Sequence, residues 1–114
     1  MTQRLTIDEH EDGGTCVVRP RGDVDLAVSQ DLRRVLLARA KAGHELVVDM
    51  SGVGYIDSSG IASLIEAFQT TRQKNLRFAL AAVPERAMRV LKLARLDRVL
   101  PLMDTVDPSF GDPA

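Results

Sequence analysis

The segment ELVVDMSGVGYIDSSGI, residues 45–61, contains three structural signals in succession. Its first part, Glu45–Met50, is a short apolar run between polar ends, which predicts a central buried strand. Gly52 and Gly54 indicate a loop after that strand. A helix is then predicted over Ser59–Lys74, because apolar residues follow at the i, i+3, i+4, i+7 spacing of one helix face: Ile61, Leu64, Ile65 and Phe68.

Two strands and a helix are predicted on the N-terminal side of this segment. Leu5–Glu9 alternates apolar and polar residues, and Cys16–Arg21 follows a turn, so the two form a candidate hairpin. Pro20 weakens the far end of the second strand or places it at a sheet edge, and Gly22 ends it. Val28–Ala42 has helical spacing of its apolar residues.

The C-terminal side predicts a strand, a helix and a last short strand. These are Leu76–Ala82, Pro84–Ala94 and Arg98–Leu102, with Pro101 implying an edge position. Asn75 is expected to end the preceding helix in a left-handed turn. Residues 104–114 are rich in helix breakers, so we expect a frayed tail and at most a rudimentary final helix.

This order of elements predicts an α/β fold: a mixed sheet of four to five strands with helices packed on it, in a single domain spanning residues 1–114. A chain of 114 residues is long enough to bury a core without disulfides or metal. Cys16 is the only cysteine, and a buried small hydrophobe is the favoured interpretation.

Composition excludes several functional classes. A net charge of -1, with 15 basic and 16 acidic residues, gives no electrostatic footprint for nucleic acid or for an anionic membrane. No signal peptide or membrane span is predicted, so we expect a cytoplasmic protein. The arginines near positions 33 and 86–89 are interpreted as solvated helix faces. No metal ligands cluster and no catalytic arrangement is found, so no cofactor, metal site or enzyme activity is predicted.

The segment Asp57-Ser58-Ser59-Gly60 has two interpretations. Asp and Ser are good N-cap residues, and Gly60 would let the first turn of the helix pack closely, so the segment can be an ordinary helix start. Alternatively, the N–H groups and partial positive charge of the helix start can tolerate a phosphate on an accessible serine. Phosphorylation there would repel a docked partner without unfolding the domain.

Gly22-Asp23-Val24-Asp25 also has two interpretations. It can be a polar turn, with Asp25 or Ser29 capping the next helix. Alternatively, its carboxylates lie at the same end of the sheet as Ser58 and meet a basic partner surface.

Residues 47–61 resemble the signature of the STAS domain, which is shared by sulfate-transporter tails and anti-sigma factor antagonists. Residues 22–25 resemble a second family signature, a Gly–acid–apolar–Asp turn. The order of elements agrees over nearly the whole chain. A free-standing domain of 114 residues is most similar to the antagonist branch of the family.

The resemblance implies a partner and a switch. The unmodified domain would bind an anti-sigma factor that is a serine kinase with a histidine-kinase-like ATPase fold, and so release the sigma factor. The kinase would phosphorylate Ser58, with Ser59 as second choice, and a metal-dependent serine phosphatase would reset it. The domain would be a monomer. The partner-binding residues implied are Asp23, Asp25, Asp57, Ser58, Ser59, Gly60 and Ile61.

Three departures from the family pattern stand out. Ala94-Arg95-Leu96 replaces a Thr–Gly–Leu sequence, Asn75 stands where a Gly is common, and the last helix is reduced or missing. The residues are also compatible with a non-switching STAS adaptor, such as a subunit of a stress-signalling scaffold or of a lipid-transport complex. A nucleotide-binding function ranks third, because no Lys-bearing phosphate loop is present.

Overall fold

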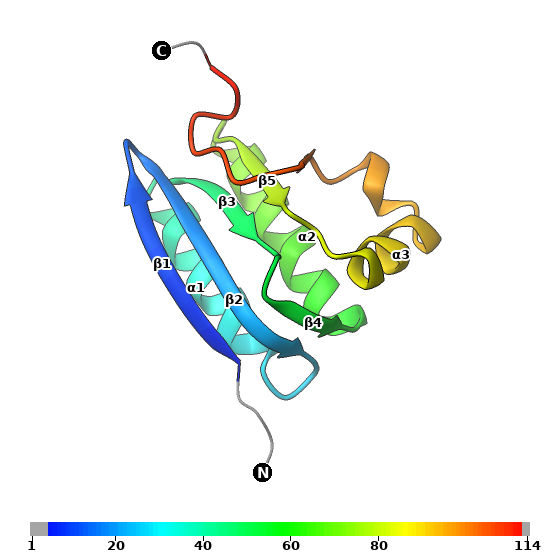
Figure 1. The fold of residues 1–114 in the computed structure, drawn as a ribbon. Coiled ribbons are helices and arrows are strands. Elements are labelled where there is room, and N and C mark those ends of the chain that lie inside the picture. The colour runs from blue at the N-terminus through cyan, green and yellow to red at the C-terminus, as the bar shows by residue number, and fades with distance from the viewer. Residues whose placement is uncertain (1–4, 113–114) are drawn as a thin grey trace.

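A computed structural model describes residues 5–112 as one layer of sheet with helices on one face (Figure 1). The element order agrees with the predicted α/β class. The elements are β1 (Thr6–Asp12), β2 (Thr15–Val24), α1 (Ser29–Lys41), β3 (Glu45–Asp49), β4 (Val53–Ile56), α2 (Ser58–Gln73), β5 (Phe78–Ala81), α3 (Glu85–Leu93), the 3-10 helix η1 (Leu96–Arg98) and β6 (Leu102–Met103).

The sheet is mixed, as predicted, but it has six strands rather than four to five. Its order is β1-β2-β3-β5-β6, with β4 paired to β2. Only the β1–β2 hairpin is antiparallel, and the other pairs are parallel. The additional strand is β4, which we predicted as a loop. Four residues that include Gly54 show no strand periodicity, so the pairing with β2 alone makes this segment a strand.

Strand β2 continues past Pro20, which was expected to weaken its far end, and past Gly22, which was expected to end it. Its first half pairs with β3 up to Val18, and its last residues pair with β4 from Gly22 onward. Pro20 lies between these two pairings, so its missing N–H removes no bond to either partner. Gly22 has φ of 115°, at a register shift in the ladder, which is a conformation that suits glycine. Pro20 therefore lies within an interior strand, not at an edge.

The main core lies between the sheet and the three α-helices. Leu32 and Leu36 of α1 and Leu64 of α2 are completely buried there, together with Val18 and Leu80 from the sheet. The predicted apolar faces of α1 and α2 are thus confirmed in their main residues. Within residues 5–112, no helix is long and apolar enough to cross a membrane.

The other face of the sheet is covered in part by the C-terminal tail, which crosses in front of β3 and β5 in Figure 1. Val106 and Phe110 pack on the buried side chains of Val17, Val47 and Ala81. The expected fraying of this segment is therefore wrong for residues 104–112. No final helix forms there; the described tail ends in turns instead.

Polar contacts fix this tail in place. The Asp107 carboxylate accepts hydrogen bonds from the Ser109 N–H (3.0 Å) and the Gly111 N–H (2.9 Å), which closes a turn. The Arg77 guanidinium lies 4.6 Å from the centre of the Phe110 ring. Arg77 also pairs with Glu45 of β3 (3.0 Å) and with Asp112 (2.6 Å), so it joins the sheet to the tail.

The connection after α3 differs from the predicted strand. Residues 96–98 form η1, and β6 is a two-residue edge strand that begins only at Leu102. Ala94, the last residue of the predicted helix, lies just beyond the end of α3 and is exposed. Two non-glycine residues occupy left-handed turns where the family pattern favours glycine: Asn75, as predicted, and Arg95, both with φ of 59°. For an arginine this conformation costs about 1–2 kcal/mol.

Candidate functional site

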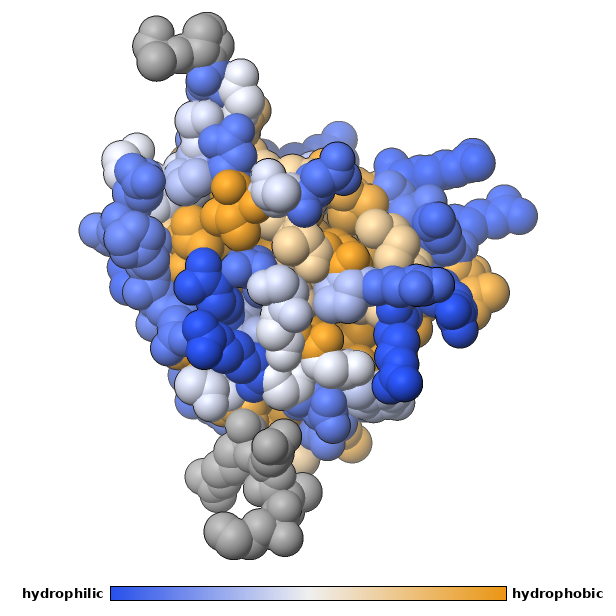
Figure 2. Space-filling model, viewed as in Figure 1, coloured by the Kyte–Doolittle hydropathy of each residue, from blue (hydrophilic) through white to orange (hydrophobic). Residues whose placement is uncertain are grey.

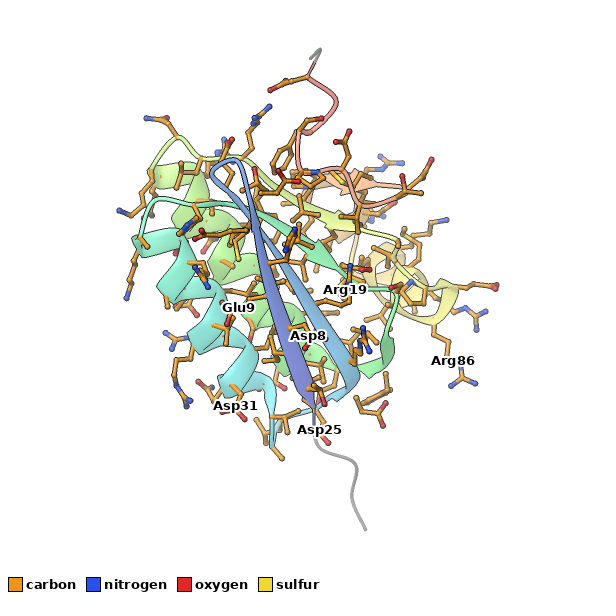
Figure 3. All side chains as sticks on the ribbon, turned by 60° about the vertical axis from the view of Figure 1, so that its left-hand side comes forward. Asp8, Glu9, Arg19, Asp25, Asp31 and Arg86 are labelled. Carbon is orange, nitrogen blue, oxygen red and sulfur yellow. The ribbon has the colours of Figure 1, made fainter. Side chains whose placement is uncertain are left out.

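The two sequence motifs meet at the carboxyl end of the sheet. β2 and β4 are parallel, with Val24 opposite Ile56, so Asp25 and Asp57 follow directly after two paired strand ends. The Asp57 N–H donates a hydrogen bond to the Val24 carbonyl at 3.2 Å. Figure 3 shows Asp25 at this lower end of the sheet. The tertiary structure thus establishes the proximity that the sequence left open.

Asp57 is the N-cap residue of α2. Its carboxylate accepts hydrogen bonds from the N–H groups of Ser59 (2.9 Å) and Gly60 (3.1 Å), and from the Ser59 hydroxyl (2.6 Å). The Ser59 hydroxyl and these N–H groups hold the pKa of Asp57 below its usual value, because they stabilise the charged form. The helix-cap interpretation of the segment is therefore confirmed, with Asp57 as the cap and α2 beginning at Ser58.

The two adjacent serines differ in their surroundings. Ser58 is exposed, and its hydroxyl makes no hydrogen bond to any residue within 5–112. Ser59 is only half-buried, but its hydroxyl is committed to Asp57. Ser58 is consequently the more accessible nucleophile of the pair.

Gly60 and Ile61 lie beneath this surface. A Cβ on Gly60 would lie 2.7 Å from side-chain carbons of both Ile56 and Val24, closer than packed carbons approach. Gly60 therefore lets α2 lie directly on the ends of β2 and β4. Ile61 is only 6% exposed and belongs to the core. These two residues shape the site from within, while Ser58 reaches its surface.

Asp23, near the end of β2, and Asp25, just after that strand, flank the site. Asp23 is exposed and lies against Gly54, where an added Cβ would approach its Oδ1 to 2.9 Å. The Asp25 carboxylate accepts a hydrogen bond from the Ala27 N–H at 3.0 Å. The N-cap position of α1 is Val28, which makes no side-chain cap, so neither Asp25 nor Ser29 has the predicted capping role.

Two exposed apolar residues of this region were missed by the sequence analysis. Leu26, directly after Asp25, has 74% of its surface exposed, and Tyr55 on β4 has 55% exposed. In the sequence, Leu26 precedes the helix predicted over Val28–Ala42, and this is the one signal that it does not belong to the buried face of that helix. Each could add apolar contact area to a surface whose other exposed groups are polar.

The model of the STAS domain family matches residues 6–108, nearly the whole chain. The chain belongs to the STAS domain family. Among its relatives, a Mycobacterium tuberculosis protein named as a candidate anti-anti-sigma factor is 28% identical over 114 residues, covering 96% of this chain and 75% of that protein.

Solved STAS structures share the fold. An anti-sigma factor antagonist from Mycobacterium paratuberculosis matches with a TM-score of 0.84 at 26% identity, covering 91% of this chain and 89% of that one. The Bacillus cell fate determinant SpoIIAA in its phosphorylated form matches with a TM-score of 0.71 at 16% identity, covering 91% and 93%. The six-stranded sheet and three α-helices described above are thus a STAS architecture.

Proposed function

We propose that this STAS domain is an anti-sigma factor antagonist switched by phosphorylation of Ser58. The observation that carries the proposal is the exposed Ser58 hydroxyl at the start of α2, which bonds to no described residue and lies at the same sheet end as Asp23, Asp25 and Asp57. The relatives named as antagonists support the class of function. The SpoIIAA structure in a phosphorylated form supports a switch by phosphate within this fold.

In the unmodified state the site would bind the anti-sigma factor through a mixed surface. Asp23, Asp25 and Asp57 form no ion pair with any described residue, so their charge is available to a basic partner surface. Leu26 would supply apolar contact area beside these charges. Ser58 and Ser59 would contact the partner directly. Gly60 and Ile61 are buried, so they would act indirectly by shaping the surface above them.

A phosphate on Ser58 would change the charge of the surface without opening the fold. It adds roughly -1.5 to -2 charges, and the partial positive charge of the α2 start tolerates them. The cap need not break, because the Asp57 carboxylate already takes the Ser59 and Gly60 N–H groups. Like charges forced together across an interface cost several kcal/mol, and about 1.4 kcal/mol is a factor of ten in affinity.

In this proposal the chain is substrate and ligand rather than enzyme. The partner is an anti-sigma factor serine kinase with a histidine-kinase-like ATPase fold, which would supply ATP and its metal. A metal-dependent serine phosphatase would remove the phosphate. The domain would act as a monomer, with neither nucleic acid nor membrane as a partner.

The decisive experiment is phosphorylation by such a kinase encoded near the chain's gene. The wild type, Ser58→Ala and Ser59→Ala would be incubated with the kinase and ATP, and the phosphate located by mass spectrometry. We expect modification of the wild type and of Ser59→Ala at Ser58, and none of Ser58→Ala. Absence of phosphate on either serine with every candidate kinase would favour a non-switching adaptor.

A binding measurement tests the switch itself. We expect Ser58→Ala to bind the anti-sigma factor as tightly as the unphosphorylated wild type does. The phosphorylated wild type should bind it at least about tenfold more weakly. Ser58→Asp should lie between them, because aspartate carries less charge than phosphate. Equal affinity of phosphorylated and unmodified protein would rule out the electrostatic switch while leaving the binding role intact.

A further inference from the structure

The outer face of α3 carries cations and an exposed leucine. Arg86, Arg89 and Leu93 follow one another at spacings of three and four residues, so they share one helix face, opposite the buried Ala87 and Leu91. Leu93 has 82% of its surface exposed, more than the other exposed large apolar residues of the described chain. Figure 3 shows Arg86 pointing away from the sheet.

The turn after α3 extends this face. Lys92, Arg95, Asp97 and Arg98 line one shallow hollow of about 430 Å³. Val99 follows with 53% of its surface exposed. Long hydrophilic side chains project from the right-hand side of Figure 2, where Figure 1 places α3. Cationic and aliphatic side chains thus alternate over one continuous segment.

The charge of this segment differs in sign from that of the chain. Residues 85–99 contain five cationic and two acidic side chains, whereas the whole chain has a net charge of -1. Among the described residues, the ion pair that involves these cations joins Arg89 to Glu85, both exposed, at 3.6 Å. Such a pair is weak in water, so most of the positive charge is available to a ligand.

Arg95 adds an independent observation. It holds a left-handed conformation, φ of 59°, which glycine adopts without strain. The chain therefore has an arginine at a turn where that residue lowers stability. Strained residues of this kind concentrate at functional positions, where the side chain has a role other than folding.

We propose that Arg89, Lys92, Leu93, Arg95, Arg98 and Val99, the α3–η1 surface, form a second docking site that binds an acidic polypeptide segment containing apolar side chains. The cations match acidic side chains, and Leu93 and Val99 match apolar ones. Aliphatic rather than aromatic side chains between the cations favour a polypeptide over single-stranded nucleic acid. The proposal does not depend on the function proposed for Ser58.

The full chain, labelled with ¹⁵N, would be titrated with a random copolymer of glutamate and tyrosine, and with polyglutamate alone, in 150 mM salt. We expect NMR shifts centred on Leu93, Arg95 and Val99, and at least threefold tighter binding of the copolymer. Shifts spread evenly over all exposed cations, or equal affinities for the two polymers, would overturn the proposal.

Two variants separate docking from folding. Arg95→Gly should weaken copolymer binding at least threefold while raising the midpoint of thermal unfolding, because the turn loses its strain. Leu93→Ser should weaken binding similarly. Arg34→Ala, which removes an exposed cation of α1, is the control and should bind like the wild type. If Arg95→Gly bound like this control, or if anionic vesicles bound the α3–η1 surface and the copolymer did not, the inference would fail.

Discussion

At the residue scale, Gly60 sets how closely α2 approaches the sheet. Gly60→Ala places a methyl group 2.7 Å from carbons of Ile56 and Val24, so the helix must shift or the strand ends must give. Overpacking costs about 1–3 kcal/mol, partly offset by the better helix propensity of alanine. We expect a net loss of about 1–2 kcal/mol in the free energy of unfolding, measured by urea denaturation.

Ser58→Ala is the matched control for that measurement. Ser58 lies two residues from Gly60 in the same helical turn, but its side chain is exposed and its hydroxyl forms no hydrogen bond with a described residue. We expect a change within about 0.5 kcal/mol. A loss as large as that of Gly60→Ala would mean that the whole first turn, rather than the close approach of Gly60, is sensitive to substitution.

The cap at Asp57 gives a second prediction at this scale. Asp57→Ala should lower the free energy of unfolding at pH 7 by about 1 kcal/mol, because two N–H groups lose their acceptor. Asp57→Asn keeps an N-cap acceptor and should cost less. Chemical denaturation of the three proteins tests this order, and an alanine variant as stable as the wild type would contradict it.

At the scale of elements, the tail is an ordered cover for one sheet face. Phe110→Ala should lower the free energy of unfolding by about 1–2 kcal/mol, less than for a fully buried phenylalanine because Phe110 is half-buried. Thr105→Ala, at an exposed position of the same segment, should change it little. Thermal denaturation compares the two, and equal midpoints would mean that the tail contributes no stability.

The elements differed in how well the sequence predicted them. α1, β3 and α2 were predicted within one or two residues, because each has a periodic or continuous apolar pattern bounded by turn residues. β4 and the last three residues of β2, from Gly22 to Val24, were not, because each depends on the other for its pairing. The tail was not predicted either, since its order comes from Arg77 and from the apolar patch on the sheet beneath it.

At the scale of the whole molecule, several carboxylates couple folding to pH. The Arg77 guanidinium lowers the pKa of Glu45, and the Ser59 hydroxyl together with backbone N–H groups lowers that of Asp57. Burial raises the pKa of Asp49, but hydrogen bonds from Ser51 and Arg19 outweigh it, and the net shift is downward. These groups therefore bind protons less readily when folded than when unfolded.

The sign of the pH dependence follows directly. The ordinary pKa values are 3.8 for the two aspartates and 4.5 for Glu45, so their stabilisation is fully present above about pH 5. It is lost as pH falls through the lower pKa values of the folded state. Urea midpoints between pH 3 and pH 7 should be level near neutrality and fall in acid. Glu45→Gln should show a shallower fall, whereas midpoints level down to pH 3 would refute the coupling.

The sequence by itself determined the α/β fold class and a helix start within residues 57–60, because these depend on local periodicity and on cap chemistry. A functional role for residues 22–25 and 57–60 came from the resemblance to the STAS family and stays a proposal. Only the tertiary structure decided that the two segments adjoin, since strand pairing between β2 and β4 brings them together. It also distinguished the exposed hydroxyl of Ser58 from the hydrogen-bonded hydroxyl of Ser59. The exposure of Leu26 and the grouping of the residues of the α3–η1 surface were likewise visible only in the folded chain. Burial and hydrogen bonding between distant segments are not encoded in any short stretch of sequence.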